Sequence, residues 1–229
     1  MTNAPEFLNQ IIIGALPIVF AIVAHEVMHG VVAKYLGDDT ASRAGRLTLN
    51  PIAHIDLFGT IILPAMLLFM HAPVFGYAKP VPINFAKLRN GRVGMVMVAA
   101  AGPFTNLALA AISILLMLLI APYQDSQWAP AILKPIWLML GQSMAINVAL
   151  AIFNLLPILP LDGGRVLAGI LPLRFARVLA RFEPAGFLVL FLLLYSQRFL
   201  MLLSVVTSGV EHELISGISL VYYGAKVIL

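Results

Sequence analysis

The sequence contains no cysteine and few charged residues. With no cysteine among 229 residues, disulfide bonds, four-cysteine zinc sites and a thiol nucleophile are all excluded. Any metal that this chain binds must therefore be held by histidine and carboxylate side chains. Charged residues make up 10% of the chain, against about 25% in soluble domains. Such a deficit is typical of a protein that is embedded in a lipid bilayer.

Apolar residues are abundant instead, at 61% of the chain. The segments at about 8–36, 93–121 and 132–156 are each long enough to cross a bilayer as a helix. The tail from residue 186 adds two more spans, or one span and an interfacial helix. We therefore expect an all-α polytopic membrane protein, a bundle of about five to six transmembrane helices that forms a single domain over residues 1–229.

The motif His25-Glu26-Val27-Met28-His29 lies inside the first apolar segment. Two histidines four residues apart lie on the same face of a helix, and their ring nitrogens can reach one tetrahedral Zn²⁺. Glu26 is rotated about 100° from His25, so it is better placed to reach a water bound to the metal than to bind the metal itself. This arrangement is typical of zinc metalloproteases, with the glutamate as general base. Ionisable residues inside a membrane helix are costly, which favours a functional role over a chance pair of buried histidines.

A catalytic zinc of this kind needs a third protein ligand and an open position for water. Asp162 is the best candidate, because it follows two prolines and precedes two glycines, a context that predicts unwound backbone at membrane depth. The alternative is that Asp162 caps a helix or pairs with Arg165.

Two asparagines lie within apolar segments, Asn154 and Asn106. Each could donate to a developing oxyanion or bind an extended substrate backbone, and each could equally join two helices. For Asn154 the functional role is favoured, since it lies two turns before Asp162. For Asn106 we favour packing, with Gly102 allowing close helix approach, and keep Asn106 among the candidate substrate-binding residues.

The apolar run 57–70 is short for a crossing and contains Pro64, which favours a re-entrant segment. The stretch 76–84 contains Pro80 and Pro82, and these exclude a helix and favour an extended, strand-like loop at the membrane. Beside the short run, His54 and Asp56 could bind a second metal, but contacts within a loop are favoured.

Basic residues predict how the chain sits in the membrane, and with a net charge of only +4 they do not indicate a nucleic-acid partner. If 8–36 runs from outside to the cytoplasm and 57–70 does not cross, 11 of the 14 lysines and arginines are cytoplasmic. If 57–70 crosses and the N-terminus is cytoplasmic, nine of the 14 are. The positive-inside rule favours the first arrangement, with the site opening toward the cytoplasm.

Three ordered motifs resemble those of the site-2 protease family of intramembrane zinc metalloproteases, and together they cover about residues 17–165. The motifs are His25-Glu26-Val27-Met28-His29, then Gly102-Pro103-Phe104-Thr105-Asn106, then Asn154-Leu155-Leu156-Pro157 leading to Asp162-Gly163-Gly164. The resemblance implies one Zn²⁺ per chain, held by His25, His29 and Asp162, with Glu26 activating the attacking water and Asn154 contacting the substrate or the oxyanion.

The same resemblance implies that the loop 76–84 pairs with an unwound substrate by β-addition, and so marks Gly76, Tyr77, Ala78 and Lys79 as substrate-binding residues. The chain shows neither a PDZ-like insertion nor a nucleotide-sensing C-terminal domain, and resembles a minimal member. It is expected to be a multi-pass protein of the cell membrane that cleaves transmembrane proteins within or near their membrane helices, in regulated intramembrane proteolysis. The alternative is a membrane transporter or handling protein for zinc.

Overall fold

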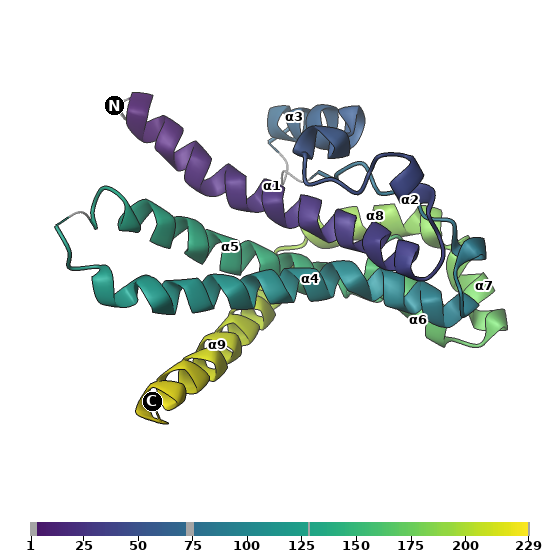
Figure 1. Cartoon of the computed structure of the whole chain (residues 1–229). Helices are drawn as coiled ribbons and strands as arrows, with labels where there is room; N and C mark the ends of the chain where they lie inside the picture. Colours follow the sequence, from purple (N-terminus) through teal and green to yellow (C-terminus); the bar gives the residue numbers. More distant parts are fainter. Residues whose placement is uncertain (1–3, 72–75, 128, 229) are drawn as a thin grey trace.

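The computed structural model describes residues 4–71, 76–127 and 129–228, and the chain folds into helices joined by loops (Figure 1). The long helices are α1 (Ala4–Tyr35), α4 (Gly91–Ile120), α5 (Leu133–Asn154) and α9 (Gln197–Ile228). The shorter ones are α2 (Thr40–Arg43), η1 (Pro51–His54), η2 (Leu57–Ile62), α3 (Leu63–Phe69), η3 (Phe85–Lys87), η4 (Ala121–Tyr123), α6 (Asp162–Ile170), α7 (Leu173–Arg181) and α8 (Glu183–Tyr195).

Helices α1, α4 and α5 lie side by side, and α6 packs against α4 near the C-terminal end of α1 (Figure 1). Small residues fill the contacts between them: Ala21, Ala110 and Ala151 are each 0% exposed. Membrane helices associate through close packing rather than through the hydrophobic effect, and small side chains allow that approach. The α1–α4–α5 group is thus the rigid frame on which the candidate site is placed.

Four helices are long and apolar enough to cross a membrane, over Ile12–Tyr35, Gly91–Tyr123, Leu133–Asn154 and Gln197–Tyr222. Helices α7 and α8 form an apolar pair bent by 63°, which would make a fifth span if the two were counted together. The prediction of an all-α polytopic membrane protein is confirmed. The described residues contain four or five candidate spans, at the low end of the expected count.

The apolar run after η1 forms the π-helix η2 and the α-helix α3, which together contain 13 residues. At 1.5 Å per residue they reach about 20 Å. A bilayer interior is about 30 Å thick, so this length agrees with the expectation that the run does not cross as a single helix. That it is re-entrant stays a prediction.

The stretch 76–84 contains no helix, as its prolines predict. Its first half is bound to the η1–η2 region, since Tyr77 N donates to Gly59 O at 3.1 Å and Lys79 N donates to His54 O at 2.9 Å. His54 is 2% exposed, and its Nε2 lies 2.9 Å from Thr48 O. Asp56 also makes a loop contact, because its carboxylate accepts the Gly59 N–H at 2.7 Å. Both residues therefore have the local role that the sequence favours.

The far end of the same stretch is bound by Asp38, which is 0% exposed. Its Oδ2 accepts the backbone N–H of Asn84 at 2.6 Å, and its Oδ1 accepts from the backbone N–H and the hydroxyl of Thr40. Burial would raise the pKa of this carboxyl, but the hydrogen bonds from Thr40 and Asn84 outweigh it and hold the pKa below its usual value. Asp38 thus fixes the end of the loop to the end of α1.

We expect Asp38→Asn to destabilise the protein by about 1–3 kcal/mol, a shift of several degrees in melting temperature. The amide has one acceptor oxygen where the carboxylate has two, so its buried N–H₂ would face the backbone N–H of either Asn84 or Thr40. The pKa of Asp38 is lowered in the folded state, so its contribution exists at neutral pH and is lost as the pH falls through that lowered value. The melting difference between variant and wild type, measured in detergent, should therefore shrink in acid.

The neighbouring Asp39 provides a matched control, since its carboxylate is exposed and pairs with Arg43 on the surface. Asp39→Asn should leave the melting temperature nearly unchanged, because exposed ion pairs contribute little. Equal effects of the two substitutions would contradict the assigned role of Asp38.

Candidate metal and catalytic site

Helix α1 carries His25 and His29 on one face, one turn apart. Both residues are 6% exposed, and their rings meet edge to face with centroids 4.7 Å apart. Asp162 is the first residue of α6, and the irregular backbone lies just before it, over residues 155–161. The expectation of unwound backbone at Asp162 itself is therefore wrong by one residue, because the glycines after Asp162 continue as helix.

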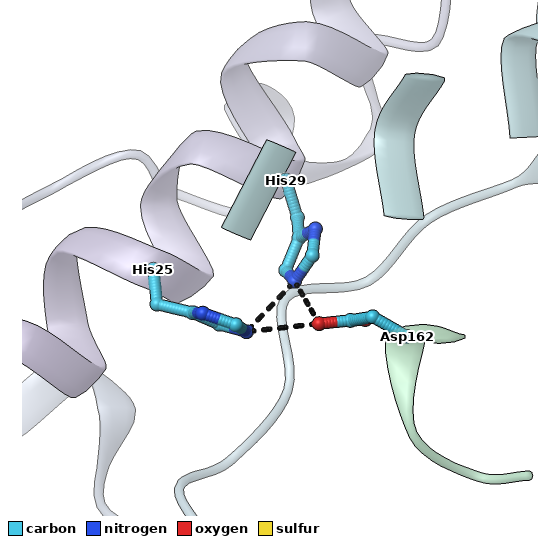
Figure 2. Close-up of side chains that lie close together, drawn as sticks. All are labelled: His25, His29 and Asp162. Carbon is cyan, nitrogen blue, oxygen red and sulfur yellow. Dashed lines mark hydrogen bonds and ion pairs between the residues drawn. The ribbon is translucent and has the colours of Figure 1, made fainter. Parts of the chain in front are cut away.

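Three atoms from these side chains converge on one point (Figure 2). His25 Nε2 lies 3.1 Å from His29 Nε2 and 3.1 Å from Asp162 Oδ2, and His29 Nε2 lies 3.3 Å from the same oxygen. The structure thus brings together residues that are more than 130 positions apart in the sequence.

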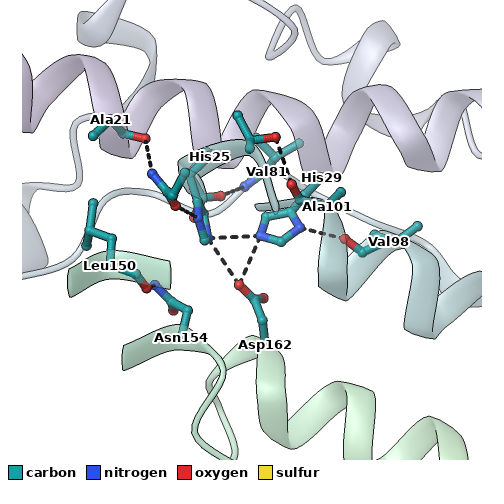
Figure 3. Close-up of polar contacts among 12 residues, drawn as sticks. Ala21, His25, His29, Val81, Val98, Ala101, Leu150, Asn154 and Asp162 are labelled. Atoms are coloured by element: carbon teal, nitrogen blue, oxygen red, sulfur yellow. Dashed lines mark hydrogen bonds and ion pairs between the residues drawn. The ribbon is translucent and has the colours of Figure 1, made fainter. Parts of the chain in front are cut away.

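The hydrogen bond of the other nitrogen, Nδ1, in each ring indicates whether Nε2 carries a proton or a lone pair. His29 Nδ1 lies 2.7 Å from Val98 O, and His25 Nδ1 lies 2.6 Å from Asn106 Oδ1 (Figure 3 shows the His29 contact). Both partners are oxygens that accept, so each Nδ1 carries a proton and each neutral ring presents a lone pair at Nε2. Asp162 Oδ2 is buried and accepts no hydrogen bond from the described residues. Three lone pairs therefore face one another, and a cation bound between them would relieve their repulsion.

The donor set fits zinc. Two imidazole nitrogens and one carboxylate oxygen are ordinary zinc ligands, and a tetrahedral site with bonds of about 2.0–2.1 Å has donor atoms about 3.3 Å apart. The observed separations of 3.1–3.3 Å agree with that figure. Three protein ligands leave one position open, as in catalytic rather than structural zinc sites.

Glu26 lies in the same cavity as these three residues. Its Oε2 accepts the backbone N–H of Val81 at 3.0 Å, which ties the carboxylate to the extended stretch 76–84. Val81 stands between Pro80 and Pro82, which have no N–H. The Val81 N–H is therefore the one backbone donor among these three residues, and it is bound to Glu26.

The cavity has a volume of about 140 Å³, enough for a few water molecules. In addition to the two histidines, Glu26 and Asp162, its lining includes Asn154, Arg165, Phe85, and Pro80, Val81 and Ile83 of the extended stretch. Gly76, Tyr77 and Ala78 line a second, apolar cavity of about 470 Å³ beside α1, and Lys79 lines neither. The residues of the loop nearest the metal-facing atoms are therefore the later ones. The sequence contained a signal for them, because Pro80 and Pro82 leave Val81 as the one donor between them.

The two asparagines lie in different places. Asn154 lines the cavity, where its Nδ2 donates to Leu150 O of its own helix at 3.0 Å (Figure 3). Asn106 is 0% exposed and bonds His25, so it has no surface for a substrate to touch. This position agrees with the packing role favoured for Asn106 and not with its place among the substrate-binding candidates.

One face of α4 fits the two histidines. Val98, Gly102 and Asn106 are spaced four residues apart, so they lie on the same side of the helix, with an acceptor at each end and a gap between. A Cβ on Gly102 would lie 2.5 Å from both His25 Cε1 and His29 Nε2. Any side chain at position 102 would collide with the two histidine rings, so glycine is needed there. The sequence predicts that Gly102 allows close approach of helices, and the structure shows that it makes room for the rings.

Comparison with known proteins supports this interpretation. The model of peptidase family M50 matches residues 118–196, which include Asn154 and Asp162. The chain is 37% identical over 183 residues to "Putative zinc metalloprotease YwhC" of Bacillus subtilis (strain 168), covering 78% of this chain and 77% of that protein. It is 31% identical over 158 residues to "Putative zinc metalloprotease MJ0611" of Methanocaldococcus jannaschii, covering 68% and 69%. No solved structure matches the chain.

The chain belongs to peptidase family M50, the site-2 protease family, as its three ordered motifs indicate. It is a multi-pass membrane protein of a metalloprotease family. The family match begins after His25 and His29, so the assignment of these residues depends on the geometry described above.

We expect Gly102→Ala to weaken zinc binding at least about tenfold, because the added methyl group displaces one or both metal-facing rings. Bound zinc would be measured on purified protein. Gly141→Ala is the matched control, since Gly141 lies in α5 and a Cβ there meets nothing within 4 Å. Unchanged zinc affinity in Gly102→Ala would show that the rings are not confined as the structure indicates.

Proposed function

We propose that this protein is an intramembrane zinc metalloendopeptidase that hydrolyses peptide bonds within or near the transmembrane helices of membrane-protein substrates. The observation that carries the proposal is the convergence of three buried lone pairs in one cavity with the carboxylate of Glu26. Such a set is costly inside a bundle of apolar helices unless it is used. Membership of a metalloprotease family supports the same chemistry.

His25, His29 and Asp162 would hold the zinc ion, one per chain. When bound, zinc polarises the scissile carbonyl and makes a coordinated water more acidic. Glu26 would take a proton from the attacking water and pass it to the amine nitrogen as the C–N bond breaks, so that one water is consumed and a carboxylate and an amine are released. The Val81 N–H occupies Glu26 Oε2 and leaves Oε1 for this transfer.

Asn154 would contact the substrate or the developing oxyanion, because it lines the cavity beside Asp162. Its amide N–H₂ donates to Leu150 O in this structure, and an N–H₂ has a second proton to offer. The role therefore needs no break in the existing hydrogen bond.

The substrate would lie along the stretch 76–84. The N–H groups of Tyr77, Lys79 and Val81 are already donated within the protein, and Pro80 and Pro82 have none. Pairing with a substrate would thus depend largely on substrate N–H groups that donate to carbonyl oxygens of this stretch. A helix uses its own N–H groups internally, so the substrate must first unwind where it meets the enzyme.

The active site would open toward the cytoplasm. His29 lies six residues before the end of α1, about 9 Å along the helix axis, and α4 begins at the same end of the bundle (Figure 1). The segments at this end contain Arg43, the last residue of α2, and the loop residues Arg46 and Arg89. The positive-inside rule favours a cytoplasmic side for such segments of a cell-membrane protein.

The decisive test is cleavage of a model transmembrane substrate by purified protein in detergent, with bound metal measured on the same samples. We expect Glu26→Gln to abolish cleavage and retain zinc, because it removes the base but no ligand. Asp162→Ala should lose both zinc and cleavage.

Wild-type cleavage should also stop when a zinc chelator is added. Cleavage that persists in Glu26→Gln would refute the role of the base, and unchanged zinc in Asp162→Ala would remove that residue from the ligands. Zinc flux into proteoliposomes that survives Glu26→Gln would favour transport over proteolysis.

A proline scan of the substrate tests the pairing. Proline beside the stretch 76–84 should lower cleavage about two- to twelvefold for each lost N–H donor, at roughly 0.5–1.5 kcal/mol per hydrogen bond. Proline a full turn further away should preserve or raise cleavage, because it weakens the substrate helix without removing a paired donor. A uniform response at all positions, compared with alanine at the same positions, would argue against pairing through substrate N–H groups.

A further inference from the structure

A line of hydrogen bonds leads away from the candidate metal site into the contact between α4 and α5. It begins at His25 Nδ1, 2.6 Å from Asn106 Oδ1 on α4, and continues from Asn106 Nδ2 to Asn147 Oδ1 on α5 at 2.7 Å. From Asn147 it passes to Ser143, whose hydroxyl lies 2.9 Å from that of Ser113. Asn106 and Asn147 are both 0% exposed.

This line has a fixed direction, which is set by backbone carbonyls. Asn106 Nδ2 also faces Ala21 O at 3.3 Å, and Asn147 Nδ2 faces Ser143 O at 2.8 Å. A carbonyl oxygen can only accept, so rotating either amide by 180° would set oxygen against oxygen. Two buried amides thus have one favourable orientation each, and each supports the orientation of the other.

The direction matters at His25. With Asn106 Oδ1 held toward the ring, His25 Nδ1 must donate, and the lone pair of the neutral ring must then be at Nε2. Nε2 is the atom that faces His29 and Asp162. His29 needs no such side chain, because its Nδ1 meets the carbonyl of Val98 directly.

We propose that Asn147 is a positioning residue for the metal site, which fixes the amide of Asn106 and through it the tautomer and orientation of His25. The inference rests on the zinc site of the proposed function and adds to it a residue on a third helix, outside the cavity and the three motifs. It makes the contact between α4 and α5 a determinant of metal affinity. An asparagine that served only to join helices would stabilise the bundle without affecting the metal.

The test measures zinc affinity of the purified wild type and variants by competition with a chelator, together with the melting temperature of the zinc-free proteins. Asn147→Leu removes the acceptor that orients Asn106, and we expect zinc to bind about tenfold more weakly, at the low end for residues that support a ligand. Asn106→Leu should cost at least as much. In the Asn106→Leu background, adding Asn147→Leu should cause no further loss, because Asn147 acts through Asn106.

Ser113→Ala is the matched control, since it removes a hydroxyl from the far end of the line while Asn147 keeps Ser143 O. Its zinc affinity should equal that of the wild type. Should Asn147→Leu fail to fold, Asn147→Asp provides a second variant. Its buried carboxyl is expected to be neutral, to accept from Asn106 and to donate to Ser143 O, so zinc affinity should stay within about threefold of the wild type.

Three results would overturn the inference: wild-type affinity in Asn147→Leu, additive losses in the double variant, or a tenfold loss in Asn147→Asp. A drop in zinc-free melting temperature with unchanged affinity would show a purely structural role. Failure of the wild type to bind zinc would instead refute the metal site of the proposed function. The two failures are therefore distinguishable, and neither depends on a substrate.

Discussion

The structure depends on one constraint, which is that three lone pairs face one another inside a bundle of apolar helices. His25, His29 and Asp162 present acceptors 3.1–3.3 Å apart, and apolar side chains and lipid offer them no hydrogen-bond donor. A cation is the physical solution, and zinc fits the donor types and their spacing. Much of the surrounding structure holds these three side chains in place.

One face of helix α4 positions both histidine rings. Val98 and Asn106 supply acceptors for the outer nitrogens of the rings, and Gly102 between them supplies the space. The orientation of Asn106 is in turn fixed from α1 and α5, by Ala21 and Asn147. The positions of the metal-facing atoms thus depend on contacts among three helices. This accounts for the buried amides of Asn106 and Asn147 at helix contacts that apolar side chains could also fill.

The carboxylate of Glu26, the proposed base, is coupled to the stretch 76–84, which is proposed to bind the substrate. Glu26 accepts from Val81, and the segment that contains Val81 is bound at its two ends, by Lys79 to His54 and by Asn84 to Asp38. A displacement of the segment would move the hydrogen bond that orients the base. Under the proposed function, substrate binding and base orientation would therefore be linked through the Val81 N–H, because the neighbouring Pro80 and Pro82 have no N–H to donate.

The sequence by itself determined the all-helical membrane class, the extended stretch 76–84 and the histidine pair, because each depends on local chemistry: apolar run length, proline, and four-residue spacing on a helix. It also selected Asp162 from a short list of carboxylates in apolar surroundings. The tertiary structure decided the rest. It placed Asn106 behind His25 rather than in the cavity, gave Val81 to Glu26, and introduced Asn147 and Asp38, which no motif marks. These roles come from contacts between segments that are far apart in the chain. Local sequence patterns do not determine which partner a buried amide or carboxylate will bind.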